Sequence, residues 1–113
     1  MDIETIREIC KSLPSVTEDI KWGADLCFLI GEKMFCVAGM DTPLKVSLKV
    51  TDEEFGEMSA RAGIIPAPYV ARYKWILIED MSVFSRKQWE EYLAQSYNLV
   101  KTKLPKKVLA GLK

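Results

Sequence analysis

The residues of this sequence best suited to bind a ligand are basic side chains in two stretches. Lys45 and Lys49 lie on the polar side of the segment from Leu44 to Val50, in which every second residue is apolar. Such residues project from the same face of a strand, so these two ammonium groups are expected on one exposed surface. The stretch before the last apolar run adds two cations and an aromatic ring: Arg72, Tyr73 and Lys74. Cations bind phosphates and a tyrosine can stack on a base, so the pattern is typical of nucleic-acid contact. The alternative is a solvated strand face whose lysines prevent edge-to-edge association.

A second basic group lies near the C-terminus, where no acidic residue follows Glu91. Its members are Lys101, Lys103, Lys106, Lys107 and Lys113. Cations at the C-terminal end of a helix gain about 0.3–1 kcal/mol each from the helix dipole, which explains the group without a ligand. The functional alternative is contact with a phosphate backbone or an acidic partner. The 16 basic and 16 acidic residues cancel over the whole chain. Net charge therefore excludes only a uniformly basic nucleic-acid binder.

The sequence contains no histidine, which argues against an enzyme. Serine–histidine and cysteine–histidine nucleophile systems are excluded, and no ordinary side chain is left to act as a general base near neutral pH. Two groups of carboxylates remain, Glu18 with Asp19 and Asp52 to Glu54. The second group fits the first turn of a capped helix, and the first has no visible partner. Neither forms a general acid–base pair, so we expect a non-enzymatic protein.

The three cysteines, Cys10, Cys27 and Cys36, contain no Cys-x-x-Cys pair, so metal binding is not expected. Glycine-rich phosphate loops are absent too, and no cofactor is expected. An odd cysteine count, no signal peptide and no apolar run near 18 residues predict a cytoplasmic protein without a membrane partner.

The apolar patterning predicts an α+β fold in one domain, residues 1–113. Helical spacing covers residues 3–13, and capping boxes begin further helices at Thr51 and Ser85. Strands are predicted at 26–30, 34–38, 44–50 and 74–78, with an irregular or edge strand within 64–73. The order α-β(3)-α-β(2)-α predicts a two-layer sandwich with an antiparallel sheet.

Both faces of the first predicted hairpin are apolar. Its loop, Gly31-Glu32, is typical of a type II′ turn and would set Cys27 opposite Cys36. A redox pair is conceivable there, but buried thiols acting as small apolar residues are favoured. Alternate residues then give one face Leu26, Phe28, Ile30, Phe35 and Val37, and the other face Cys27, Leu29, Met34, Cys36 and Ala38.

Helices cover only one face of a two-layer sandwich. The other face can form a homodimer surface or a ligand groove, unless the last helix or the 64–73 segment covers it. The candidate residues for a ligand or partner face are Trp22, Leu29, Met34 and Trp75.

Short motifs in a fixed order connect the sequence with a known family. They are Leu13-Pro14, Val16-Thr17-Glu18, Trp22-Gly23, Lys33-Met34-Phe35, Ser47-Leu48-Lys49, Trp75, Ser96-Tyr97 and Leu104-Pro105-Lys106-Lys107. In this order the chain resembles the MmcQ/YjbR-like family over almost its whole length. Many members carry a histidine and an Asn-Lys pair before the tryptophan, where this chain has Ala71-Arg72-Tyr73-Lys74.

The resemblance implies a small bacterial protein with a fold like that of type III secretion chaperones and a "double-wing" likeness to DNA-binding proteins. We therefore expect a cytoplasmic DNA binder that contacts phosphates through its basic residues. The candidates are Lys45, Lys49, Arg72, Tyr73, Lys74, Lys103, Lys106 and Lys107. The alternative is a module that binds a protein or small ligand on the apolar sheet face, as the chaperone likeness suggests.

Overall fold

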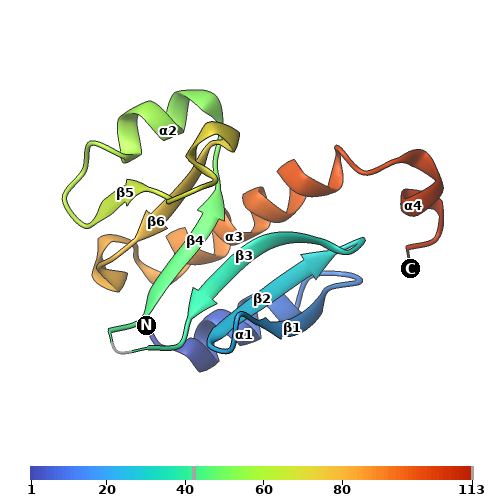
Figure 1. The fold of residues 1–113 in the computed structure, drawn as a ribbon, viewed down its shortest axis with the longest axis horizontal. Helices are drawn as coiled ribbons and strands as arrows, with labels where there is room; N and C mark the ends of the chain where they lie inside the picture. Colours follow the sequence, from blue (N-terminus) through green and yellow to red (C-terminus); the bar gives the residue numbers. More distant parts are fainter. Residues whose placement is uncertain (42, 113) are drawn as a thin grey trace.

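The computed structural model describes residues 1–41 and 43–112 and has one antiparallel sheet at its centre (Figure 1). The strands are β1 (Thr17–Lys21), β2 (Asp25–Ile30), β3 (Lys33–Gly39), β4 (Lys45–Lys49), β5 (Ile64–Pro66) and β6 (Trp75–Ile78). Their order across the sheet is β1-β2-β3-β4-β6-β5, and every neighbouring pair is antiparallel. The predicted α+β class with an antiparallel sheet is confirmed.

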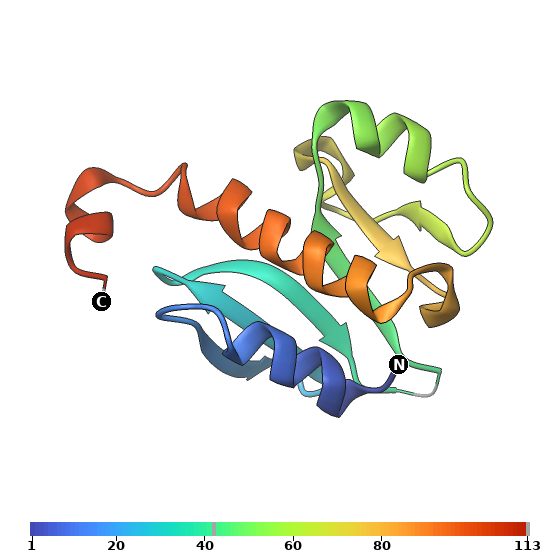
Figure 2. The same ribbon diagram turned by 180° about the vertical axis from the view of Figure 1, so that it is seen from behind.

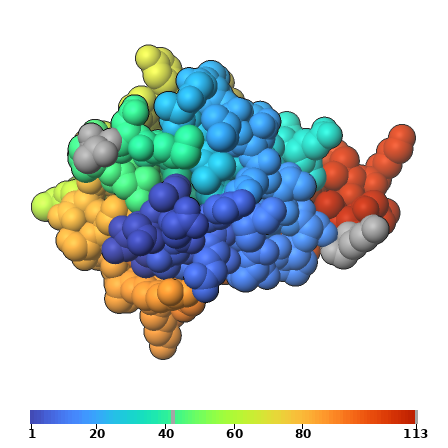
Figure 3. All heavy atoms as spheres, turned by 90° about the horizontal axis from the view of Figure 1, so that it is seen from below, coloured from blue at the N-terminus to red at the C-terminus, as the bar shows by residue number. Residues whose placement is uncertain are grey.

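Within the described residues, four α-helices accompany the sheet: α1 (Ile3–Lys11), α2 (Asp52–Met58), α3 (Arg86–Lys101) and α4 (Lys106–Ala110). Two short 3₁₀ helices, η1 (Ala71–Tyr73) and η2 (Met81–Val83), flank β6. Seen from behind, α1 and α3 lie side by side across one face of the sheet (Figure 2). The α4 helix extends beyond the sheet at one end of the molecule, where it protrudes (Figure 3).

The sequence analysis missed β1 and α4. Strand β1 contains Glu18, Asp19 and Lys21, and its one aliphatic residue, Ile20, is 58% exposed. A polar edge strand lacks the alternation on which strand prediction depends. The first run of strands therefore has four members rather than three.

The predicted helix caps are present. The Thr51 and Ser85 hydroxyls each accept the backbone N–H three residues on, and the side chains of Glu54 and Gln88 accept the N–H of the cap residue in return. These contacts satisfy amide groups that the first helical turn leaves unpaired. They fix where α2 and α3 begin, and so how these helices leave the sheet.

The core lies between the sheet and the two long helices. The fully buried Trp89 and Leu93 of α3 and Ile6 of α1 pack against inward-facing strand residues. The Trp89 indole N–H donates to the Met81 carbonyl at 3.1 Å, so this large ring is buried without an unpaired donor.

A β-bulge interrupts strand β3. Phe28 pairs with Cys36 and Leu29 with Met34, so Phe35 is an extra residue between them. The Ser96 hydroxyl of α3 lies at this point. It donates to the Phe35 carbonyl at 2.6 Å and accepts the Lys49 backbone N–H at 2.9 Å. One buried hydroxyl thus links β3, β4 and α3.

The β2–β3 turn is type I′ rather than the predicted type II′, because φ is positive at both loop residues, +56° at Gly31 and +68° at Glu32. Gly31 also contacts the C-terminal segment. A Cβ atom there would lie 2.7 Å from Leu104 Cδ1 and 2.9 Å from Val108 Cγ1. The hairpin tip and the chain around α4 are therefore packed tightly together.

Candidate binding surfaces

Three of the predicted basic residues come together at one end of strand β4. Lys49 ends β4, Lys74 follows η1, and Lys103 follows α3. Burial, followed by the ammonium groups of Lys103 and Lys74, lowers the pKa of the Lys49 amine, while Asp52 acts in the opposite direction. Within residues 1–41 and 43–112, none of the three lysines forms an ion pair with a carboxylate. We call Lys49, Lys74 and Lys103 the lysine cluster.

Two members of the cluster also have contacts within the chain. The Lys49 ammonium donates to the Tyr73 carbonyl, and Lys74 lies 5.2 Å from the centre of the Phe55 ring. Lys103 is exposed, and its side chain forms no ion pair with a carboxylate of the described residues. The cluster is therefore partly anchored, and its unpaired charge faces solvent through Lys103 and half-buried Lys74.

The other candidates on strand and turn positions lie outside this cluster. Lys45 is at the opposite end of β4 and forms an ion pair with Glu79 at 3.7 Å. The Arg72 guanidinium stacks on the neighbouring Tyr73 ring at 4.7 Å and donates to its hydroxyl at 2.7 Å. Tyr73 is 51% exposed, so its other ring surface is accessible for contact.

The described C-terminal lysines are divided between α3, α4 and the connection between these helices. Lys101 packs over the Tyr97 ring at 5.5 Å, and Lys106 and Lys107 are exposed in the first turn of α4. Lys113 lies outside the described residues. The predicted C-terminal basic group therefore contributes only Lys103 to the cluster on β4.

The sheet face opposite α1 and α3 carries an aromatic groove. It has a volume of about 550 Å³. Its lining residues are Trp22, Asp25, Met34, Val37, Ser47, Ala67, Pro68, Tyr69, Val70 and Trp75. Three of the four predicted residues of this face line it, and Leu29 lies outside. The segment of residues 67–70 forms one wall, so the face is neither fully covered nor fully open.

The bulge at Phe35 changes which side chains reach this groove. Beyond it, Cys36 and Ala38 join Phe28 in the core, whereas Val37 lines the groove. The prediction had placed Cys36, Val37 and Ala38 on the wrong faces of the sheet. The extra residue in β3 reverses the alternation of side chains between the two faces. Sequence reasoning also missed Asp25, Ser47 and Tyr69 as groove residues.

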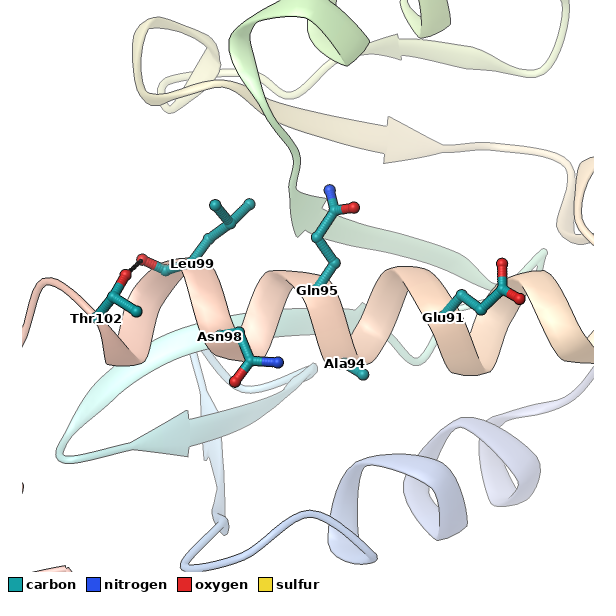
Figure 4. A pocket seen from close by; sticks show the side chains of 6 residues that line it. All are labelled: Glu91, Ala94, Gln95, Asn98, Leu99 and Thr102. Atoms are coloured by element: carbon teal, nitrogen blue, oxygen red, sulfur yellow. Dashed lines mark hydrogen bonds between the residues drawn. The ribbon is translucent and has the colours of Figure 1, made fainter.

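The outer surface of α3 has a second, shallower hollow of about 470 Å³ (Figure 4). Gln95 and Leu99 point toward the α2 side of the helix, and Ala94 and Asn98 point the opposite way. The Gln95 amide donates to Glu54 of α2, and Thr102 donates to the Leu99 carbonyl. The lining offers one carboxylate, Glu91, and no cation, so it is unsuited to phosphate.

Two of the five carboxylates considered for catalysis, Glu18 and Glu54, have structural partners. Glu18 accepts two hydrogen bonds from the Arg7 Nε and one from its Nη2, at 2.6–3.1 Å. This contact lowers the pKa of Glu18, against the opposing effect of burial. Glu54 belongs to the α2 capping box. Among the described residues, no three His, Cys, Asp or Glu side chains are placed to hold a metal ion.

The cysteines are not arranged as predicted. Cys27 lies opposite Val37 rather than Cys36, because of the bulge, and the Cys36 thiol contacts Cys10 of α1. All three thiols are free and have no exposed surface. The contact with Cys10, together with burial, raises the pKa of the Cys36 thiol well above its usual range.

We expect no thiol of the folded protein to react with Ellman's reagent at neutral pH, and all three to react after denaturation. The reagent needs an accessible thiolate, and the buried position of all three thiols denies it access. Absorbance at the end of each reaction gives the count. Rapid reaction of one thiol in the native state would contradict the packing around α1, β2 and β3.

The structure describes an α+β protein whose sheet carries helices on one face and an aromatic groove on the other, with a lysine cluster at one end of β4. The family model for YjbR proteins matches residues 11–99, so the chain belongs to the YjbR family. This match confirms the resemblance seen in the sequence motifs.

Solved structures show the same fold. The crystal structure of Deinococcus radiodurans protein DR2400, which has a DUF419 domain, is 24% identical with a TM-score of 0.81, covering 93% of this chain and 83% of that one. A Pseudomonas syringae protein is 17% identical with a TM-score of 0.72, covering 88% and 98%. No curated protein matches the chain. Within the described residues, no helix is long and apolar enough to cross a membrane.

Proposed function

We propose that this protein is a non-enzymatic, cytoplasmic DNA-binding protein that contacts phosphates through the lysine cluster. The observation that carries the proposal is the convergence of Lys49, Lys74 and Lys103 from three elements without a carboxylate ion pair among the described residues. Like charges held together repel one another, and a bound phosphate relieves that repulsion. The exposed Tyr73 ring beside the cluster adds a surface on which an unpaired base can stack.

Other features support the same function. The motifs shared with the MmcQ/YjbR-like family imply DNA binding, and the match over residues 11–99 supports membership. Arg72 adds a cation next to the cluster in the stretch where this chain departs from the usual family motif. Three fully buried free thiols are compatible with a reducing cytoplasm.

The test is duplex DNA binding by fluorescence anisotropy over a range of salt concentrations. The wild-type protein should bind a generic duplex at low salt. Each lysine that neutralises a phosphate adds about 0.9 to the slope of log K against log salt. We therefore expect K74Q/K103Q to reduce the slope by about 2 and to weaken binding. Lys49 is left intact because its ammonium also anchors the η1 turn.

The control variant, K11Q/K87Q, makes the same change in net charge away from the cluster. Both residues are exposed, and Lys87 lies near the start of α3, about 21 Å by the helical rise from Lys101, where the helix ends and the segment with Lys103 begins. This variant should keep the wild-type slope. If both double variants lost the same amount of DNA affinity and salt slope, the lysine cluster would not be the contact site. If the wild-type protein gave no anisotropy change at low salt, the proposed DNA binding would be wrong.

A further inference from the structure

The aromatic groove combines apolar walls with a carboxylate that has no partner. Asp25 lies at the start of β2, is half-buried, and makes no side-chain hydrogen bond or ion pair within residues 1–41 and 43–112. Its cross-strand neighbour, Lys21, forms no ion pair with it. A carboxylate removed from part of its water and left unpaired attracts a cation.

Aromatic side chains form much of the rest of the groove. Trp75 is almost buried in its floor, whereas Trp22 is 70% exposed and Tyr69 fully exposed at its rims. The rims come from distant parts of the sequence. The connection between β5 and β6, coloured yellow, protrudes next to the blue connection between β1 and β2 (Figure 3). Aromatic faces attract cations, most strongly when water is excluded.

Backbone conformation sets the two rim residues apart. Trp22 and Tyr69 have φ angles of +52° and +70°, in the left-handed region that bulky residues rarely adopt. Such conformations persist where the surrounding structure enforces them, and they are common at ligand clamps. Both residues present exposed rings to the same groove.

We propose that this groove binds a small organic cation, a protonated amine with a flat apolar body. The ammonium pairs with Asp25, and the body lies between Trp22 and Tyr69 over Trp75. Ser47 and the indole N–H groups of both tryptophans make no side-chain hydrogen bond among the described residues, so they are available to polar substituents. A volume of about 550 Å³ is in the range of small-molecule sites. The site is separate from the lysine cluster and does not depend on DNA binding.

The chain contains its own reporters for this site. Its three tryptophans are Trp22 and Trp75 in the groove and the fully buried Trp89 in the core. Labelling with 5-fluorotryptophan therefore gives one internal reference and two groove signals in fluorine NMR. Each signal is assigned with a single Trp→Phe variant.

The probes are 2-phenylethylamine, 2-phenylethanol and 3-phenylpropanoate, which share a phenyl body and differ in head-group charge. The amine should shift the Trp22 and Trp75 signals and leave that of Trp89 in place. A hydrogen bond to a charged group is stronger than one between neutral groups. The difference should make the alcohol bind about tenfold more weakly than the amine. The carboxylate should bind weakest. Equal shifts with all three probes, or none with the amine, would overturn the proposal.

A variant then tests the role of the carboxylate. D25N keeps the size of the side chain and removes its charge, so the amine should lose its advantage over the alcohol. The control, E57Q, removes an exposed carboxylate on α2 and should keep the wild-type preference. An unchanged Trp89 signal shows that each variant is folded. If D25N still preferred the amine over the alcohol, Asp25 would not be the partner of the cation. The comparison of the three probes on the wild-type protein tests the groove itself and needs no variant.

Discussion

Replacing Ser96 with alanine is expected to lower the free energy of unfolding by about 2–4 kcal/mol. The Ser96 hydroxyl is fully buried, donates to the Phe35 carbonyl at 2.6 Å and accepts the Lys49 N–H at 2.9 Å. It connects β3 and β4 one position beyond the end of their regular pairing, at which Cys36 lies opposite Leu48. Alanine leaves two buried backbone groups unpaired, and each such group costs about 1–3 kcal/mol. Urea denaturation followed by circular dichroism measures the loss.

The matched control is S59A. Ser59 also donates its hydroxyl to a backbone carbonyl, that of Phe55, but this carbonyl already accepts the Ser59 backbone N–H. Removing the hydroxyl therefore leaves no orphaned group, and we expect a change below about 0.5 kcal/mol. If S96A and S59A proved equally mild, β3 and β4 would have closed directly onto each other, and Ser96 would not be the element that maintains the bulge.

The second large effect is expected for G31A, with a loss of about 2–4 kcal/mol. An alanine in the left-handed conformation costs about 1–2 kcal/mol, and overpacking adds about 1–3 kcal/mol. Both apply here, because φ is +56° and the new Cβ would lie within 3 Å of Leu104 and Val108 side-chain atoms. The variant should also loosen α4, which can be followed by amide hydrogen exchange in residues 104–112.

The G23A variant separates the two causes. Gly23 has φ of +80°, and an added Cβ would meet no atom within 4 Å, so only the backbone penalty remains. We expect a loss of about 1–2 kcal/mol and no change of exchange in α4. The double variant G31A/V108A should recover part of the G31A loss, since one crowded contact is removed. Equal losses for G31A and G23A, without recovery, would show that the hairpin does not support α4.

The fold class could be predicted because its signals are local. Thr51 and Ser85 cap their own helices, and the alternation from Leu44 to Val50 follows from the period of a strand. Strand β1 gave no such signal, because it lies at the sheet edge and its polar residues are held there by pairing with β2. Local propensity does not report a partner that lies elsewhere in the chain.

The candidate surfaces could be predicted only as sets of residue types. The lysines were evident from the sequence, but their grouping was not. Lys103 joined Lys49 and Lys74, while Lys45 paired with Glu79 at the other end of the same strand. Trp22, Met34 and Trp75 were assigned to one face, yet Asp25, the one acidic residue among those that line the groove, was not. An aspartate beside a turn is common, and only the fold shows that Asp25 lies half-buried among aromatic side chains.

The α+β class, the helix caps, the lack of histidine and the family motifs can all be recognised in the amino-acid sequence. The face of the sheet on which each side chain of β3 lies depends instead on contacts between distant parts of the chain. A single bulge at Phe35, with its carbonyl bound by Ser96 from sixty-one residues away, moves Cys36 and Ala38 into the core and Val37 to the groove. Side chains of a strand alternate between its two faces with a period of two, so one extra residue, bound by a long-range contact, exchanges the faces of all residues beyond it in the strand.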